Sequence, residues 1–120
     1  MDSKTIPSQE LFQQMDQAIR SEKLYADPFL QRQDILARFG ISRRTLCALM
    51  SAYADGLSIT AYINAMRIDD AERMLKENPD MSFTDIAESV GFTLATFRDQ
   101  FKRRFGMTPT EYCQGTNRGE

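Results

Sequence analysis

The stretches DILARFGISRRTLCALM at residues 34–50 and DIAESVGFTLATFRDQF at residues 85–101 align without a gap when one is shifted by 51 positions. The shift places Gly40 on Gly91, and the apolar positions of the two stretches largely coincide. Repetition at a fixed period indicates that one supersecondary unit occurs twice in a chain. Two copies of a small helical unit are therefore expected within 120 residues.

Both stretches are typical of a short helix, a turn at glycine and a second helix. Their apolar residues recur at helical steps, and glycine tolerates the left-handed backbone of a tight turn. No useful stretch alternates with the period of a strand. The fold class is predicted to be all-α with about seven helices, at residues 8–23, 31–38, 42–54, 58–77, 82–89, 93–105 and a last short helix from 108.

Serine or threonine precedes most of these helices and can serve as an N-cap. The expected caps are Ser8, Ser42, Ser58, Ser82, Thr93 and Thr108. Two of them are read as capping boxes, through Asp85 and Glu111. The inner face of the helix over 42–54 is expected to carry Leu46, Leu49, Met50 and Tyr53. The long helix over 58–77 is expected to keep one 3.6-residue apolar period from Ile59 to Leu75.

These elements predict two helix-turn-helix subdomains joined by a long connecting helix. The expected organisation is an N-terminal helix at 1–23 that packs on the first lobe, the first lobe at 24–57, the connecting helix at 58–78, the second lobe at 79–115 and a frayed polar tail at 116–120.

Composition excludes several classes of protein. The chain has no histidine and only two cysteines, Cys47 and Cys113, which are far apart. A metal site, a disulfide framework, a cofactor site and histidine-based catalysis are therefore poorly supported, and the chain is not expected to be an enzyme. The sequence contains no apolar run long enough for a membrane span and no signal-peptide pattern.

Charge is unevenly distributed, although the net charge is only −2. Each copy of the repeat carries a cluster of basic residues, whereas acidic residues gather elsewhere. A helix-turn-helix unit places its second helix in the major groove of DNA. The connecting helix would be about 30 Å long at 1.5 Å per residue, close to the roughly 34 Å that separates successive major grooves on one face of the duplex.

The faces of 42–54 and 93–105 that lie opposite their apolar residues provide the candidate DNA contacts. Arginine can bind guanine bidentately, and small apolar groups can contact the thymine methyl. The expected base contacts are Arg43, Arg44, Cys47, Ser51, Leu94, Ala95, Arg98 and Lys102. The expected phosphate contacts are Ser42, Arg67, Thr93, Arg103 and Arg104. We expect the first of these helices to supply more base readout and the second more anchoring.

The chain resembles the DNA-binding domain of AraC/XylS-type transcription regulators over about residues 24–114. The motif IAESVGF at 86–92 and the motif FRDQFKRRFGMTPTEY at 97–112 carry most of the resemblance, and RIDDAERML at 67–75 is similar to the connecting helix of that family. The resemblance implies binding to promoter DNA in two adjacent major grooves, and RNA polymerase as a partner.

A second hypothesis is a degenerate helix-turn-helix module that binds proteins and has lost DNA binding. It is motivated by the net negative charge, by the apolar Leu94 and Ala95 on the exposed face of the helix expected over 93–105, and by Cys113, which stands where the family commonly has arginine.

Members of this family usually add a sensory or dimerisation region, and nothing in the sequence resembles one. The chain is therefore expected to be the C-terminal output domain of a longer protein, monomeric as a fragment. It is expected to act in the bacterial cytoplasm, even if the parent protein is anchored in a membrane.

Overall fold

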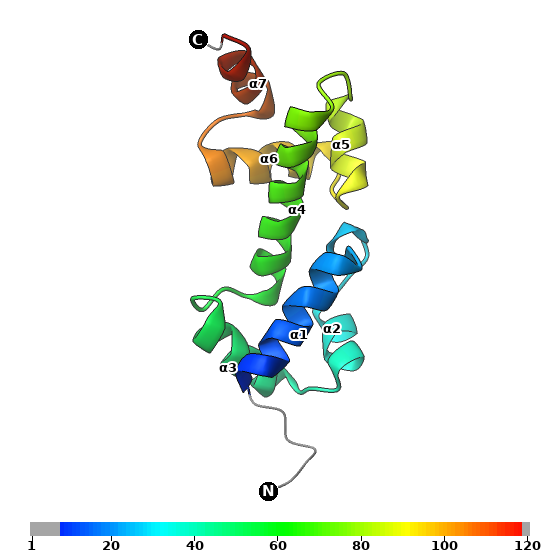
Figure 1. Cartoon of the computed structure of the whole chain (residues 1–120), viewed down its shortest axis with the longest axis vertical. Helices are drawn as coiled ribbons and strands as arrows, with labels where there is room; N and C mark the ends of the chain where they lie inside the picture. The colour runs from blue at the N-terminus through cyan, green and yellow to red at the C-terminus, as the bar shows by residue number, and fades with distance from the viewer. Residues whose placement is uncertain (1–7, 119–120) are drawn as a thin grey trace, which may run out of the picture.

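The computed structural model describes residues 8–118, and every element in that range is helical (Figure 1). The elements are α1 (Ser8–Ser21), the 3-10 turn η1 (Leu24–Ala26), α2 (Arg32–Phe39), α3 (Arg43–Tyr53), α4 (Ile59–Glu77), α5 (Phe83–Ser89), α6 (Leu94–Phe105) and α7 (Pro109–Arg118). The prediction of an all-α fold with about seven helices is confirmed. No helix in this range is long and apolar enough to cross a membrane.

The long helix α4 runs through the middle of the molecule, with α1, α2 and α3 around one half and α5, α6 and α7 around the other (Figure 1). Each half encloses its own apolar core. The first core contains Met15, Ile19, Tyr25, Ile35, Leu46, Met50, Ala54, Ile59, Ile63 and Met66. The second core contains Ile68, Ala71, Leu75, Ile86, Ala87, Val90, Phe92, Phe97 and Phe101. We call the two halves the first and second lobes.

The apolar residues of α4 form two stripes, not one. Residues advance about 100° around a helix, so Ile59, Ile63 and Met66 lie on one side while Ile68, Ala71 and Leu75 lie on nearly the opposite side. The prediction of a single 3.6-residue period was therefore wrong, and it missed Ile68, which is buried in the second core. The stripe changes sides at residue 67 because the two lobes pack on opposite faces of one helix.

The sequence repeat extends to the whole arrangement of helices. α1 and α4, α2 and α5, and α3 and α6 each begin 51 residues apart, and α7 begins 50 residues after α4. The helix α4 thus ends the first structural unit and begins the second. Such sharing lets each lobe form a multi-helix core although the chain has only 120 residues.

The N-termini of α3 and α6 are capped in the same way. The Ser42 hydroxyl accepts from the Thr45 N–H at 3.1 Å and donates to the Thr45 hydroxyl at 3.1 Å. The Thr93 hydroxyl accepts from the Thr96 N–H at 3.2 Å and donates to the Thr96 hydroxyl at 3.0 Å. These two caps, predicted from sequence, are confirmed.

The other expected caps have mixed outcomes. Ser58 caps α4 and accepts from the Ala61 N–H at 3.0 Å. Thr108 and Glu111 form the expected reciprocal box at the start of α7, with bonds of 2.9 and 3.1 Å. Ser82 caps α5 through the Asp85 N–H at 3.0 Å, but no return bond from the Ser82 N–H to the Asp85 carboxylate occurs. Ser8 lies inside the first turn of α1, and the residue before it is outside the described range.

One further expectation needs correction, the placement of Tyr53 on the inner face of α3. Tyr53 is 39% exposed at the edge of α3, and its ring is tilted against that of Phe12 in α1, with 5.5 Å between the centroids. The helix α7 spans Pro109–Arg118, and Tyr112 in its first half packs edge-on against Phe101 at 5.3 Å. The frayed tail expected at 116–120 stays a prediction. Residues 1–7 and 119–120 of the expected organisation lie outside the described range.

Removing either cap should destabilise the fold. We expect Ser42→Ala and Thr93→Ala each to lower the free energy of unfolding by about 1 kcal/mol, because a helix N-terminus loses its side-chain acceptor. Urea denaturation followed by circular dichroism measures the change. The control is Ser51→Ala, since Ser51 is exposed in the last turn of α3 and does not cap its N-terminus. Equal stabilities for Ser42→Ala and Ser51→Ala would contradict the role of the cap.

Candidate nucleic-acid interface

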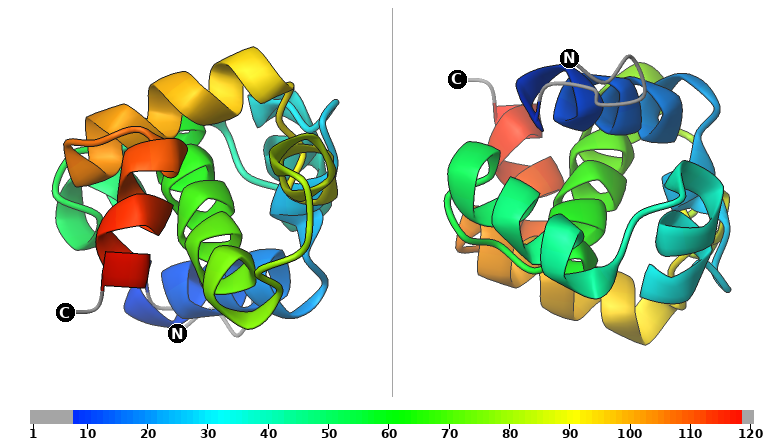
Figure 2. Two further views of the ribbon diagram at one scale, coloured as in Figure 1. Left: turned by 90° about the horizontal axis from the view of Figure 1, so that it is seen from above. Right: turned by 90° about the horizontal axis from the view of Figure 1, so that it is seen from below.

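The helices α3 and α6 lie on the side of α4 opposite α1, as the two end-on views show (Figure 2). Each follows a left-handed glycine, Gly40 with φ +63° or Gly91 with φ +90°. In each unit the glycine turn sets the second helix across the first, and the hydroxyl cap fixes where the second helix begins. The structure therefore contains two helix-turn-helix units whose second helices face the same side.

The exposed face of α3 carries all of the base contacts predicted on it. Arg43, Arg44, Cys47 and Ser51 are exposed, and the opposite face is buried through Leu46, Leu49 and Met50. The four predicted residues therefore form one continuous surface on the outside of the first lobe.

Three of the four base contacts predicted on α6 are exposed. Ala95, Arg98 and Lys102 are exposed. Leu94 is half-buried and packs against the second core. Its position explains the difference, because Leu94 precedes Phe97 and Phe101 by three and seven residues and thus lies on the buried stripe. Leu94 is therefore less accessible than the other three residues, and its predicted base contact stays a prediction.

The predicted cations differ in whether an acidic residue neutralises them. Arg103 pairs with Asp99 at 3.0 Å. Arg104 donates from Nε and Nη2 to the two carboxylate oxygens of Asp69, at 3.1 and 3.0 Å. We call the exposed faces of α3 and α6 the recognition faces. In the described part of the chain, no carboxylate lies within ion-pair distance of the four cations on these faces, Arg43, Arg44, Arg98 and Lys102. Four of the described cations without an ion pair thus lie on the exposed faces of α3 and α6.

A groove of about 440 Å³ lies between α6 and the first half of α4. Its polar lining includes Asn64, Gln100, Arg103 and Arg104, and it reaches Ser58 at the start of α4. The groove therefore extends from the loop that follows α3 to the end of α6, and the paired arginines lie along it.

The side-chain hydroxyl groups of two predicted phosphate contacts already form hydrogen bonds within the protein. The hydroxyls of Ser42 and Thr93 already accept and donate within their caps. The first backbone N–H groups of α3 and α6 remain as donors, and helix N-termini bind phosphate through such groups. Any phosphate contact at these two positions is therefore expected from the backbone.

Arg67 does not fit the phosphate role suggested by the sequence. Its Nε donates to the carbonyl oxygen of Tyr25 at 2.5 Å, and its Nη2 donates to that of Asp27 at 2.9 Å. Its guanidinium also lies over the Phe92 ring, 5.4 Å from the centroid. Burial lowers the pKa of Arg67 from its ordinary value, and the side chain is held between the lobes. The sequence showed an arginine on a helix but not the segment that would cover it.

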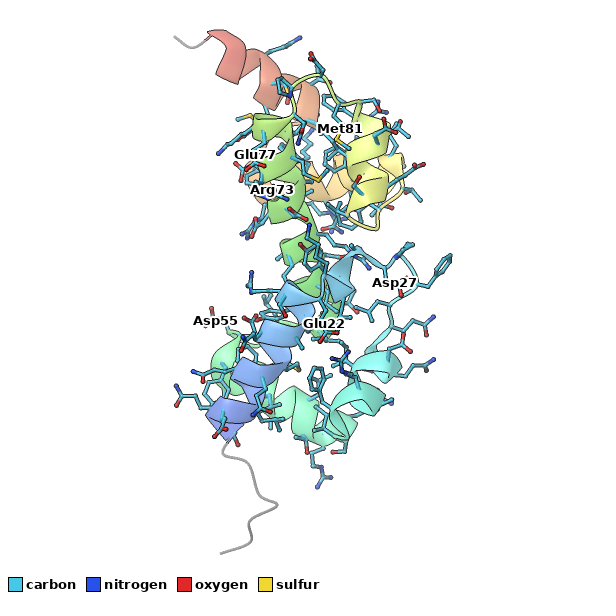
Figure 3. All side chains as sticks on the ribbon, turned by 45° about the vertical axis from the view of Figure 1, so that its right-hand side comes forward. Glu22, Asp27, Asp55, Arg73, Glu77 and Met81 are labelled. Carbon is cyan, nitrogen blue, oxygen red and sulfur yellow. The ribbon has the colours of Figure 1, made fainter. Side chains whose placement is uncertain are left out.

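Tyr25 is a second residue at this junction that the sequence did not single out. Its hydroxyl donates to Asp70 at 2.9 Å, and Asp70 also accepts from Arg73 at 2.9 Å. Burial, and then the bond to Asp70, raise the pKa of Tyr25 to about 12. Figure 3 shows Arg73 beside Glu77, with which it forms a second ion pair at 2.6 Å.

Within residues 8–118, no group of three or more histidine, cysteine, aspartate or glutamate side chains lies close enough together to hold a metal ion.

A family profile described as "Helix-turn-helix domain" matches residues 35–115. The chain is 38% identical to the HTH-type transcriptional activator RhaS of Escherichia fergusonii over 82 residues, which are 68% of this chain and 29% of that protein. It is 36% identical to the HTH-type transcriptional regulator ExsA of Pseudomonas aeruginosa over 95 residues, which are 78% of this chain and 33% of that protein. The chain belongs to the AraC-type helix-turn-helix family. It spans about a third of the length of these curated relatives.

Solved structures share the fold of this AraC-type domain. A transcriptional regulator from Chromobacterium violaceum, of the AraC-type DNA-binding domain-containing proteins, superposes with a TM-score of 0.74 at 24% identity, covering 87% of this chain and 89% of that one. The DNA-binding domain of AdpA, solved in complex with a target DNA, superposes with a TM-score of 0.69 at 23% identity, covering 90% of each chain. The family is one of transcription regulators and not of enzymes.

The bond from Tyr25 to Asp70 should make stability depend on pH in the alkaline range. We expect Tyr25→Phe to lower the free energy of unfolding by about 1–2 kcal/mol at neutral pH, because Asp70 loses a donor. The pKa of Tyr25 is raised from 10.0 to about 12. The stabilisation is therefore complete below the unfolded value and is lost as the pH rises from about 10 to 12.

Urea denaturation of wild type and variant at about pH 8 and about pH 11.5 measures this difference. The difference should shrink at the higher pH, and a difference that grows would contradict the assignment. Tyr53→Phe is the control, because the Tyr53 hydroxyl has no hydrogen-bond partner within the described residues.

Proposed function

We propose that this chain is the DNA-binding domain of an AraC-type transcription regulator and inserts α3 and α6 into two successive major grooves of one duplex. The observation that carries the proposal is the pair of equivalent helices, α3 and α6, each with an exposed basic face, on one side of a shared α4. A dimer of ordinary helix-turn-helix proteins presents two such helices. Here one chain supplies both.

The length of α4 supports docking in two grooves. Its 19 residues correspond to about 28 Å at 1.5 Å per residue. Successive major grooves on one face of DNA lie roughly 34 Å apart. Since α3 precedes α4 and α6 packs against it, this helix keeps the recognition helices at a separation of the required order.

Base contacts are proposed for the uncovered part of each recognition face. Arg43 and Arg44 on α3, and Arg98 on α6, have the donor geometry to bind guanine O6 and N7 bidentately. Cys47, Ser51, Ala95 and Lys102 complete the proposed set. The arginines are early on α3 and later on α6, so we infer that α3 supplies more of the sequence readout.

Phosphate contacts are proposed for Arg103, Arg104 and the N-terminal backbone of α3 and α6. In the free protein Asp99 and Asp69 occupy the two arginines. Both pairs are exposed, and exposed ion pairs contribute only about 0–1 kcal/mol. DNA phosphates can therefore replace these carboxylates at low cost, and displacement of Asp69 would leave Arg104 free to bind the backbone.

The family and the packing of α6 both weaken the alternative of a protein-interaction module. Its apolar recognition face is reduced to Ala95, since Leu94 packs against the core. Cys113 is half-buried beside Met81 and Phe83, and burial raises the pKa of its thiol. Neither residue presents the apolar surface that such a module would need.

Several properties of the parent protein are proposed on the same basis. The aligned parts of this chain cover only 29% and 33% of two curated relatives, which supports a further sensory or dimerisation region. RNA polymerase is proposed as a partner in transcription, and this domain is proposed to be monomeric and to act in the cytoplasm, where promoter DNA lies.

Fluorescence anisotropy with duplexes selected from a randomised pool tests the proposed function. We expect binding that weakens steeply as salt is raised, because phosphate contacts release counterions, and a selected site that spans two major grooves. A folded sample that binds no duplex at low salt would rule out the proposal.

Single substitutions should separate base from phosphate contacts. Arg44→Ala and Arg98→Ala are each expected to cost about 1–3 kcal/mol on the selected site and to relax preference at one base pair. Arg104→Ala is expected to weaken selected and random duplexes alike and to reduce the salt slope by about one unit. Identical behaviour of Arg44→Ala and Arg104→Ala on both duplexes would contradict this division.

Releasing Arg104 should strengthen DNA binding. Asp69→Asn removes the carboxylate that holds Arg104, and we expect affinity at low salt to rise up to about fivefold, the equivalent of an exposed ion pair. The control is Asp80→Asn, which makes the same charge change in the turn between α4 and α5. If both variants gained equally in anisotropy titrations, net charge and not the Arg104 pair would be responsible.

A further inference from the structure

One short segment of the first lobe is held by residues of α4 and of the second lobe. The segment consists of residues 25–27, in and after η1, and Figure 3 shows Asp27 at the level where the two lobes meet. Arg67 lies on α4 between Met66 of the first core and Ile68 of the second. The guanidinium of Arg67 binds two carbonyl groups of the segment, at 2.5 and 2.9 Å, and covers a ring of the second lobe.

Gly91 brings the second lobe against the same segment. A Cβ at Gly91 would lie 2.9 Å from the carbonyl oxygen of Ala26 and 3.1 Å from that of Tyr25. A side chain therefore does not fit without moving backbone. Gly40, its counterpart in the repeat, has nothing within 4 Å of an equivalent Cβ. The close approach at Gly91 is thus not needed for the turn and serves the contact between lobes.

The hydroxyl of Tyr25 adds a third attachment. Its ring belongs to the first core and is 7% exposed, while its hydroxyl bonds to Asp70 in the second half of α4. The segment is therefore attached at three points, through Arg67, Gly91 and Asp70. We call these three residues together with residues 25–27 the interlobe lock.

We propose that the interlobe lock fixes the spacing between the two half-sites that this protein accepts on DNA. The inference rests on the proposed function. Each added base pair moves a half-site by about 3.4 Å and rotates it by about 35° around the duplex. A rigid pair of lobes can match one spacing only, whereas lobes that bend or twist about the middle of α4 can follow the displaced half-site.

The lock acts at the point where the buried face of α4 changes. Met66 packs in the first core and Ile68 in the second, so the two lobes meet on opposite sides of the helix at residue 67. Arg67 joins the two lobes across this point through the segment and the Phe92 ring. Arg67 is therefore a positioning residue, which acts on DNA recognition through the orientation of α3 and α6.

The test compares binding to a selected site with binding to sites whose half-sites are moved apart by one, two and three base pairs. Wild type should lose at least about tenfold in affinity at two added base pairs, since one half-site contact is lost. Arg67→Met keeps the apolar stem over Phe92 and removes the bonds to the segment. We expect this variant to bind the original site more weakly and to lose less than about threefold at two added base pairs.

The glycine pair provides a matched control. Gly91→Ala and Gly40→Ala both place a side chain at positive φ, so both lose stability in their turns. Only Gly91→Ala pushes against the segment. The dependence on spacing should flatten in Gly91→Ala and stay as in wild type in Gly40→Ala, with thermal melts confirming that each variant is folded. The same flattening in both variants would overturn the proposal.

A measurement without DNA separates the lock from the proposed function. Spin labels on Cys47 of α3 and on Asp99→Cys of α6, in a Cys113→Ser background, report the distance between recognition helices by pulsed electron resonance. We expect one narrow distribution for the wild-type junction and a broad one for Arg67→Met. If the chain bound no duplex, the proposed function and the role of the lock in spacing would both be wrong. This measurement would still show whether the lock holds the two lobes rigidly together. The proposal would be overturned if wild type and Arg67→Met had equal distance distributions, or if their affinities depended equally on the half-site spacing of the DNA.

Discussion

The burial of α4 on two opposite faces is the interaction on which the rest of the structure depends. Most of the stability of a helix in a protein comes from the packing of its apolar surface. Ile59, Ile63 and Met66 bury the first half in one lobe, and Ile68, Ala71 and Leu75 bury the second half in the other. Each lobe is completed by a helix that the other lobe also needs.

This sharing explains how a short chain presents two recognition helices. In both units the glycine turn and the hydroxyl cap fix the start of the second helix, and buried apolar side chains fix its rotation. The exposed remainder of α3 and α6 is then available for recognition. The positions of Arg44 and Arg98 at the surface follow from those of Leu46 and Phe97 in the cores, because all of them lie on the same two helices.

The ion pairs and hydrogen bonds that support the fold lie apart from the residues that we propose to contact DNA. The acidic residues of α4 hold tyrosines and arginines in place: Asp70 holds Tyr25 and Arg73, and Glu72 accepts from Tyr112 at 2.8 Å. The recognition faces keep uncompensated arginines. A net charge of −2 is therefore compatible with a DNA-binding surface, since the location of charges determines the local potential more than their sum does.

The sequence by itself determined the helices, the caps of α3 and α6, the two equivalent units and the exposed basic residues of α3, because spacing and capping act over a few residues. It could not show that α4 changes its buried face at residue 67, that Leu94 joins the core, or that Asp69 pairs with Arg104 across 35 positions. The role of Arg67 was decided only by the tertiary structure. Its side chain crosses between the lobes and binds a segment 40 residues away in the sequence, and local periodicity carries no information about such a distant partner.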